Sequence, residues 1–200
     1  MNTSPIDRLV ALAKEAGLLR PRELTAYGIA RTYLKLAVRR GRLAKVGRGL
    51  YAVGGAPVAG NIALAEVCKR VPRGVLCLLT ALRFHEIGTQ NPADVWLAVR
   101  AKDRKPQVRH IRLRIVRFSE RAMTEDVGEH YIGGVKVRMT NPHRTVVDCF
   151  KYRNKIGLDV AVEALRECRR MRLATPGQLA DCAKANHVLN VMRPYLEALA

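Results

Sequence analysis

The chain has 200 residues and a formal net charge of +19, because it contains 36 lysines and arginines but only 17 acidic residues. Apolar residues make up 48%, too many for a disordered basic tail, and aromatic residues at 5% are too few for a protein that stacks rows of bases. What remains is a folded protein of one or two domains whose excess charge suits a polyanionic partner.

The sequence predicts neither a membrane segment nor a secretory signal. Its apolar runs are shorter than the ~20 residues of a spanning helix, and its N-terminus lacks a charged segment followed by an apolar one. The five cysteines are odd in number and contain no Cys-x-x-Cys pair: Cys68, Cys77, Cys149, Cys168 and Cys182. We therefore expect a cytoplasmic protein with reduced, buried thiols, no metal site and no cofactor.

The first 57 residues predict a winged helix-turn-helix. The expected elements are helices from Ser4 to a stop at Gly17, over 22–27 and over 30–40, then strands at 43–46 and 50–53. Ser4 can cap the first helix, and Gly28 and Gly41 bound the third. The strands are joined by Gly47-Arg48-Gly49, which predicts a tight hairpin. Helix, short helix, turn, helix and hairpin is the order of a winged helix-turn-helix.

Residues 54–57, Gly-Gly-Ala-Pro, predict a connector, and hence a DNA-binding domain at 1–57 and a second domain at 58–200. In the second domain we expect helices at 62–70, 75–87, 119–126, 142–155, 158–172 and 175–186 and a last one reaching Leu199, strands at 95–100 and 111–118, and a hairpin at 131–138 turning on Gly133-Gly134. The predicted fold class is α+β: a winged helix-turn-helix, then a mixed α/β domain with a helical end.

The third helix has one apolar and one cationic face. Its packed face is expected to contain Ala30, Leu34, Ala37, Val38 and Gly41. The candidate DNA contacts are Arg31, Thr32, Lys35 and Arg39 on the outward face, Tyr33 and Arg42 at its margins, and Lys45 and Arg48 on the hairpin. Arginine on such a face can donate two bonds to guanine in the major groove.

A plainer interpretation is that these cations belong to an ordinary solvated surface. The charge distribution favours DNA, because residues 1–57 carry a net +8 whereas the much longer remainder carries +11. A second basic tract, from Lys102 to Arg117, alternates with apolar residues in its later part. It fits equally a solvated edge strand and a second surface for nucleic acid or an acidic partner.

The leading alternative is a nucleic-acid-processing enzyme, in which a nuclease-like second domain is targeted by the winged helix. Asp94 precedes a predicted strand, but Glu-x-Lys does not occur, and neither do a phosphate-binding loop, His-Glu-x-x-His or a nucleophile elbow. Arg144 and Asp148 predict an ordinary helix ion pair beside His143, and His85 a packed or capping histidine. We therefore expect no enzyme. A basic RNA-associated protein is a third possibility.

Several segments together resemble the AbiEi family, the antitoxin half of abortive-infection type IV toxin–antitoxin systems. They are GIARTYL at 28–34, RGRL at 40–43, VGRGLY at 46–51, LLTALRFH at 78–85, VWLAV at 95–99, GVKV at 134–137, TNPHRTVVD at 140–148 and AVEAL at 161–165.

The resemblance implies an N-terminal winged helix that binds operator DNA, expected as inverted repeats, and represses its own operon. It also implies a C-terminal domain that counters a nucleotidyltransferase-like toxin encoded alongside. Because members of the family are generally described as opposing the toxin without a stable complex, no toxin-binding face is inferred.

Overall fold

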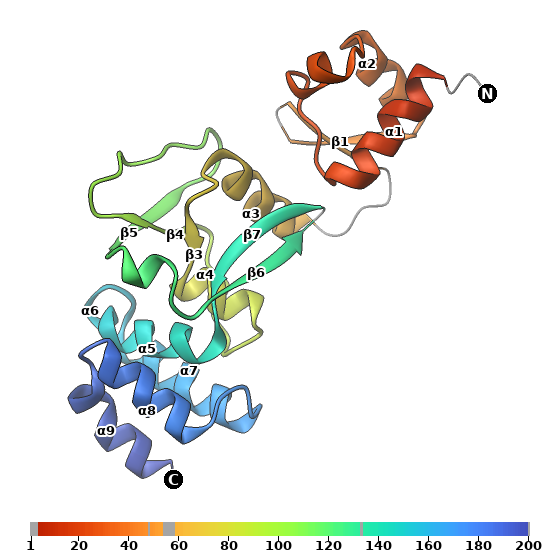
Figure 1. The fold of residues 1–200 in the computed structure, drawn as a ribbon. Coiled ribbons are helices and arrows are strands. Elements are labelled where there is room, and N and C mark those ends of the chain that lie inside the picture. The colour runs from red at the N-terminus through yellow and green to blue at the C-terminus, as the bar shows by residue number, and fades with distance from the viewer. Residues whose placement is uncertain (1–3, 48, 54–58, 133, 200) are drawn as a thin grey trace. The chain divides into compact units, whose positions relative to one another are not determined.

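The computed structural model describes residues 4–47, 49–53, 59–132 and 134–199 (Figure 1). Its chain contacts divide it into two compact units, Met1–Pro72 with His130–Val137, and Arg73–Glu129 with Arg138–Ala200. The predicted connector at 54–57, the wing-tip residue Arg48 and the first turn glycine, Gly133, lie outside the described residues. The boundary between residues 57 and 58 therefore stays a prediction.

The predicted winged helix-turn-helix is present in the first unit. Its elements are α1 (Pro5–Ala16), η1 (Glu23–Tyr27), α2 (Thr32–Arg39), β1 (Leu43–Gly47) and β2 (Leu50–Val53). Ser4 accepts a hydrogen bond from the amide of Asp7 at 3.2 Å, and Gly17 ends α1 with a φ of 65°. The expected second helix is a 3₁₀ helix, and the third begins two residues later than predicted.

The small core of this module explains why its short elements hold together. Leu9, Leu24 and Leu34 are buried at its centre, so each helix contributes apolar surface to one cluster. Leu19 pairs with Tyr51 of β2 in both directions, at 2.8 and 3.0 Å, which joins the chain after α1 to the hairpin. The first unit also contains α3 (Ala59–Arg70), whose Lys69 forms an ion pair with Glu23 at 2.9 Å.

A five-stranded mixed sheet follows, with strand order β5-β4-β3-β7-β6. Its strands are β3 (Val75–Leu76), β4 (Val95–Arg100), β5 (Leu113–Phe118), β6 (Val127–Ile132) and β7 (Val135–Thr140). Strand β3 runs antiparallel to β4 and parallel to β7, and β4 runs parallel to β5.

The predicted helix over 75–87 is wrong in its first part. Residues 75 and 76 form the central strand β3. Helix α4 (Leu78–Phe84) begins at Leu78, which has a φ of 50°. The amide of Cys77 donates to the carbonyl of Trp96, so the strand is held before the helix starts. A continuous apolar run carries no period that separates a buried strand from a buried helix.

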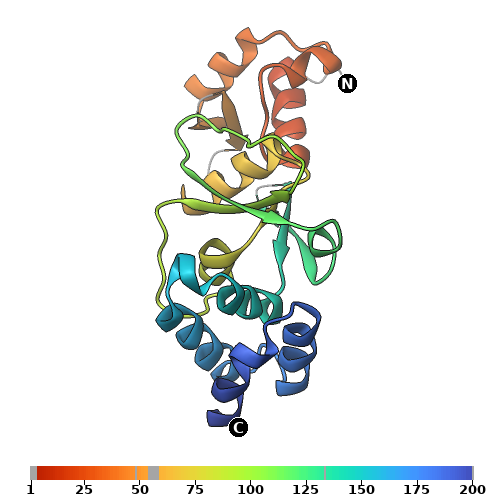
Figure 2. The ribbon, with the colours of Figure 1, turned by 90° about the vertical axis from the view of Figure 1, so that its left-hand side faces the viewer.

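The chain ends in helices, as predicted, and they share one hydrophobic core with the sheet (Figures 1 and 2). The remaining elements are η2 (Arg121–Met123), α5 (Pro142–Lys151), α6 (Arg153–Ile156), α7 (Leu158–Arg170), α8 (Pro176–Ala185) and α9 (Leu189–Ala198). Helix α5 is central to the core and buries seven consecutive residues, from Arg144 to Phe150. Across the described residues, no helix combines the length and the apolar character needed to span a membrane.

Candidate nucleic-acid interface

The turn before α2 fixes where this helix begins. Gly28 has a φ of 64°, in the left-handed region, and Ile29 then donates its amide to the carbonyl of Leu24 at 3.1 Å while its side chain is buried. Leu34 and Ala37 anchor the inner side of α2 in the core. Ala30 and Gly41 were also expected on this packed face, but both are exposed, because Ala30 precedes the first helical turn and Gly41 follows the last one. Val38 is half-buried.

The outward face of α2 is cationic and open to solvent. Arg31, Thr32, Lys35 and Arg39 are exposed, and Tyr33 is half-buried at the margin. Arg31, Lys35 and Arg39 follow one another at intervals of one helical turn, so they line one side of the helix. Among the described residues, no carboxylate forms an ion pair with these three cations. Their donors therefore remain available to an external anion.

The predicted phosphate contacts beyond α2 have different surroundings. Arg42 forms an ion pair with Asp7 at 3.1 Å, with side chains 51% and 46% exposed, so the pair contributes about 0–1 kcal/mol and a phosphate can compete with the carboxylate. Lys45 is exposed on β1, opposite Tyr51. Arg40, which was not predicted as a contact, is also exposed at the end of α2. Its position directly after Arg39 in the sequence could have identified it as a candidate contact.

The second basic tract separates into anchored and unpaired cations. Asp94 forms an ion pair with Arg112 at 2.7 Å and accepts a hydrogen bond from Arg114 at 2.8 Å, and Arg117 donates to the carbonyls of Arg100 and Asp103. These contacts of the three arginines stabilise the edge strand β5. We define the loop cations as the exposed side chains between β4 and β5 that form no ion pair among the described residues: Lys102, Arg104, Lys105 and Arg109.

The residues considered for catalysis have structural partners. The hydrogen bond from Arg114 holds the pKa of Asp94 below its usual value, so this carboxylate is an ionised anchor for two arginines. His85 lies at the end of α4 with Nε2 2.8 Å from the carbonyl oxygen of Thr140. This is the packed or capping role expected for it.

The predicted ordinary ion pair on α5 is instead buried. Arg144 donates to Asp148 at 3.0 Å, and their side chains are 1% and 0% exposed. The guanidinium carbon of Arg144 also lies 5.4 Å from the centre of the Phe118 ring. Burial raises the pKa of Asp148 to about 6. The i, i+4 spacing was therefore recognised correctly, but the solvated environment assumed for the pair was wrong.

All five cysteines are buried, as expected, and no disulfide joins them. Burial raises the pKa of Cys168 to about 11 and that of Cys182 to about 12. Within the described ranges, the side chains whose donor atoms converge closely enough for a metal ion are Asp126, His143 and Cys182, in the second unit.

Residues 7–54 match the family model described as "Transcriptional regulator, AbiEi antitoxin". The resemblance to AbiEi is confirmed for this N-terminal segment. The AbiEi match covers almost the whole winged helix-turn-helix, including every candidate DNA contact. It supports a DNA-binding transcriptional regulator of the antitoxin type.

The AbiEi match is accompanied by a likeness in fold over nearly the whole chain. The crystal structure of the RV2827C protein from Mycobacterium tuberculosis has a TM-score of 0.55 and 14% identical residues, over 98% of this chain and 80% of that chain. At this identity the likeness shows the shared mixed α/β architecture alone. No curated protein matches the chain.

Proposed function

We propose that this protein is a cytoplasmic transcriptional repressor that acts as the antitoxin of a type IV toxin–antitoxin system. It regulates its own operon by binding operator DNA, and it counters a nucleotidyltransferase-like toxin encoded alongside. The observation that carries the proposal is the exposed cationic face of α2 inside a module that matches AbiEi regulators.

In the proposed complex, α2 enters the major groove of the operator. Arg31, Thr32 and Lys35 come closest to the base edges, with Tyr33 beside them at the margin of the face. Arginine can donate two hydrogen bonds to the O6 and N7 atoms of guanine, and threonine offers a hydroxyl and a methyl group. These contacts supply sequence specificity.

The remaining cations hold the phosphate backbone on both sides of the helix. Arg39 continues the face of α2, and Arg42, Lys45 and Arg48 place charge along the following hairpin. Each phosphate contact releases bound counterions, so it strengthens binding to any duplex and increases the dependence on salt. Arg42 makes its contact by exchanging Asp7 for a phosphate.

Titration of the full chain with operator and scrambled duplexes in a mobility-shift assay tests this assignment. Arg31→Ala is expected to weaken operator binding by about 1–3 kcal/mol and to spare the scrambled duplex, whereas Arg48→Ala weakens both and flattens the salt slope by about one. Arg166→Ala, which removes one exposed charge from α7, is the control. Unchanged operator affinity in Arg31→Ala would contradict the role given to α2.

The antitoxin role is tested separately from repression, by co-expressing the protein with the product of the adjacent gene. The wild-type chain is expected to restore growth against a nucleotidyltransferase-like toxin and to silence a reporter placed behind the operator. Arg31→Ala is expected to lose silencing and still restore growth, since DNA contact and toxin neutralisation are assigned to different domains. Failure of the wild-type chain to restore growth refutes the antitoxin role alone.

A further inference from the structure

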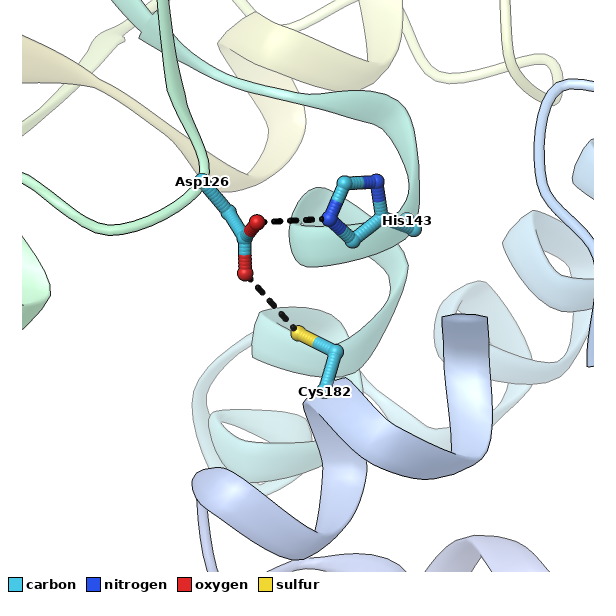
Figure 3. A group of neighbouring side chains, drawn as sticks. All are labelled: Asp126, His143 and Cys182. Carbon is cyan, nitrogen blue, oxygen red and sulfur yellow. Dashed lines mark hydrogen bonds and ion pairs between the residues drawn. The ribbon is translucent and has the colours of Figure 1, made fainter. Parts of the chain in front are cut away.

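Three side chains from separate elements of the second unit converge at one edge of the helical end (Figure 3). Asp126 lies directly before β6, His143 is in the first turn of α5, and Cys182 is on α8. Nε2 of His143 lies 2.9 Å from Oδ1 of Asp126, and Sγ of Cys182 lies 3.7 Å from Oδ2 of the same carboxylate. All three donor atoms are within 4.8 Å of one another.

The surrounding structure holds these side chains in place. Asp126 has a φ of 50°, and its carbonyl accepts the amide of Asn141 at 2.8 Å, which ties its turn to the start of α5. Helix α8 begins with a capping box between Thr175 and Gln178. Asn186 donates to the carbonyl of Cys182 at 2.9 Å, and its amide nitrogen is 3.6 Å from the sulfur. An amide donor beside the sulfur stabilises a thiolate ligand.

The order of these contacts does not suit a cysteine nucleophile. Such a nucleophile needs a histidine beside the sulfur to remove its proton, with a carboxylate behind the histidine. Here the carboxylate of Asp126 stands between the imidazole and the thiol, as Figure 3 shows. A neighbouring carboxylate makes the thiolate less favourable, so this arrangement lacks the activation that a nucleophile requires.

The donors and their spacing instead suit a metal ion of the zinc class. One imidazole nitrogen, one thiolate and one carboxylate oxygen are ligands that Zn²⁺ accepts, whereas Ca²⁺ and Mg²⁺ prefer oxygen alone. Bonds of about 2.0–2.3 Å in a tetrahedron place ligand atoms about 3.3–3.8 Å apart. The 3.7 Å from Sγ of Cys182 to Oδ2 of Asp126 lies in this range, whereas the 2.9 Å from Nε2 of His143 to Oδ1 is shorter. The carboxylate therefore has to turn so that one oxygen faces the ion, and the imidazole has to move away from it by about half an ångström.

The three side chains also line a surface cavity of about 390 Å³. Cys182 is buried, while Asp126 and His143 are partly exposed, so an ion reaches the cluster from solvent. Asp181 and Gln178 line the same cavity and offer further oxygen donors. Three protein ligands facing an accessible space leave a fourth position for water or another small ligand.

We propose that Asp126, His143 and Cys182 bind a divalent transition-metal ion, with Zn²⁺ as the natural occupant, and leave one position open to the cavity. Binding replaces the thiol proton of Cys182, which is released to solvent, and the ion then joins the turn before β6 to α5 and α8. An ion that binds only the folded protein stabilises it according to its concentration and dissociation constant. The site does not depend on the proposed DNA-binding function.

Co²⁺, a spectroscopic substitute for Zn²⁺, tests the site in the full chain after chelator treatment under a thiol-free reductant. One equivalent of Co²⁺ is expected to produce the near-ultraviolet thiolate charge-transfer band and the visible bands of a tetrahedral ion, and Zn²⁺ to abolish both. Cys182→Ser is expected to lose the charge-transfer band and to weaken Co²⁺ binding about tenfold or more. Cys168→Ser, at another buried thiol, is expected to retain the band.

Variants at the two partly exposed ligands cover the case in which Cys182→Ser does not fold. His143→Gln and Asp126→Asn are each expected to weaken Zn²⁺ binding about tenfold or more in calorimetric titrations, whereas His187→Gln, an exposed histidine, leaves it unchanged. Zn²⁺ is expected to raise the unfolding temperature of the wild-type chain and not that of His143→Gln. Absence of the thiolate band in the wild-type chain, or equal Zn²⁺ affinity in wild type and both ligand variants, would overturn the proposal.

Discussion

The ion pair between Arg144 and Asp148 shows how one turn of helix can place two charges inside a core. Both side chains are essentially inaccessible to solvent, and Oδ2 of Asp148 accepts no hydrogen bond among the described residues. A buried pair of this kind gains little net stability when intact, because desolvation offsets the attraction. Removing one partner is much more costly, since the other charge is left buried and unpaired.

We therefore predict that Arg144→Met lowers the free energy of unfolding by about 3–5 kcal/mol, measured by urea denaturation at neutral pH. The double variant Arg144→Met/Asp148→Leu is expected to recover most of this loss, because it removes both charges together. Arg170→Met breaks the exposed pair with Glu167, at 2.7 Å, and is expected to cost at most about 1 kcal/mol. Similar losses in Arg144→Met and Arg170→Met would contradict the burial of the α5 pair.

Sequence reasoning at this scale identified partners but not their environment. The i, i+4 spacing of Arg144 and Asp148 predicts that they meet on any helix, exposed or buried. Burial depends on the sheet strand that brings Phe118 against α5, a contact between residues far apart in the chain. The partners of Asp94 could not be predicted from the sequence either, because Arg112 and Arg114 reach it only when β5 pairs with β4.

At the scale of elements, the winged helix-turn-helix was predictable because its signals are local. Ser4 caps α1, Gly28 and Gly41 bound the segment containing α2, and the apolar positions of α2 recur at helical spacing. Strand β3 was missed because its identity depends on distant partners, namely Leu97 and Ala98 of β4 and Met139 of β7. A two-residue strand contains too few residues to show a period of its own.

The turn that sets the start of α2 gives a direct test of this local control. Gly28 has a φ of 64°, and a β-carbon built there meets no atom within 4 Å. The cost of Gly28→Ala is therefore conformational and not steric, and we expect it to lower the free energy of unfolding by about 1–2 kcal/mol, measured by urea denaturation. Gly28→Asn is expected to cost less, because asparagine tolerates the left-handed region.

Equal losses in the alanine and asparagine variants would show that the left-handed conformation is not what this position requires. Gly177→Ala is the matched control, because Gly177 lies inside α8 at a negative φ and alanine favours a helix. We expect this variant to be neutral or slightly stabilising.

At the scale of the whole molecule, the sequence predicted the fold class and the density of charge but not the grouping of distant residues. The net charge of +19 and its concentration in the first 57 residues are properties of composition. The cluster of Asp126, His143 and Cys182 joins residues up to 56 positions apart, and no two of the three are close together in the sequence. Spacing rules for metal sites find pairs on one hairpin or helix, so they gave no signal here.

The excess charge divides into cations with ionic or carbonyl partners and cations that face solvent. Arg112 and Arg114 form ion pairs with Asp94, and Arg117 donates to backbone carbonyls, so these three side chains stabilise the sheet edge. The loop cations lie together on one connection whose ends are fixed by Arg117 and by the buried Val108. Clustered unpaired charges of one sign produce a stronger local potential than the same charges dispersed.

We accordingly predict that replacing the four loop cations by glutamine slows association with a non-specific duplex, measured by stopped-flow at about 50 and 200 mM salt. The reduction is expected to be larger at the lower salt, where screening is weaker, and the ratio of operator to non-specific affinity is expected to stay unchanged. A control with the same change in charge replaces four dispersed, exposed cations of the second unit by glutamine: Arg166, Arg172, Lys184 and Arg193. If net charge alone governed association, both variants would slow equally. A larger effect of the loop variant is the expected result. An equal or smaller effect would show that the basic tract is a solvated sheet edge and not a surface for nucleic acid.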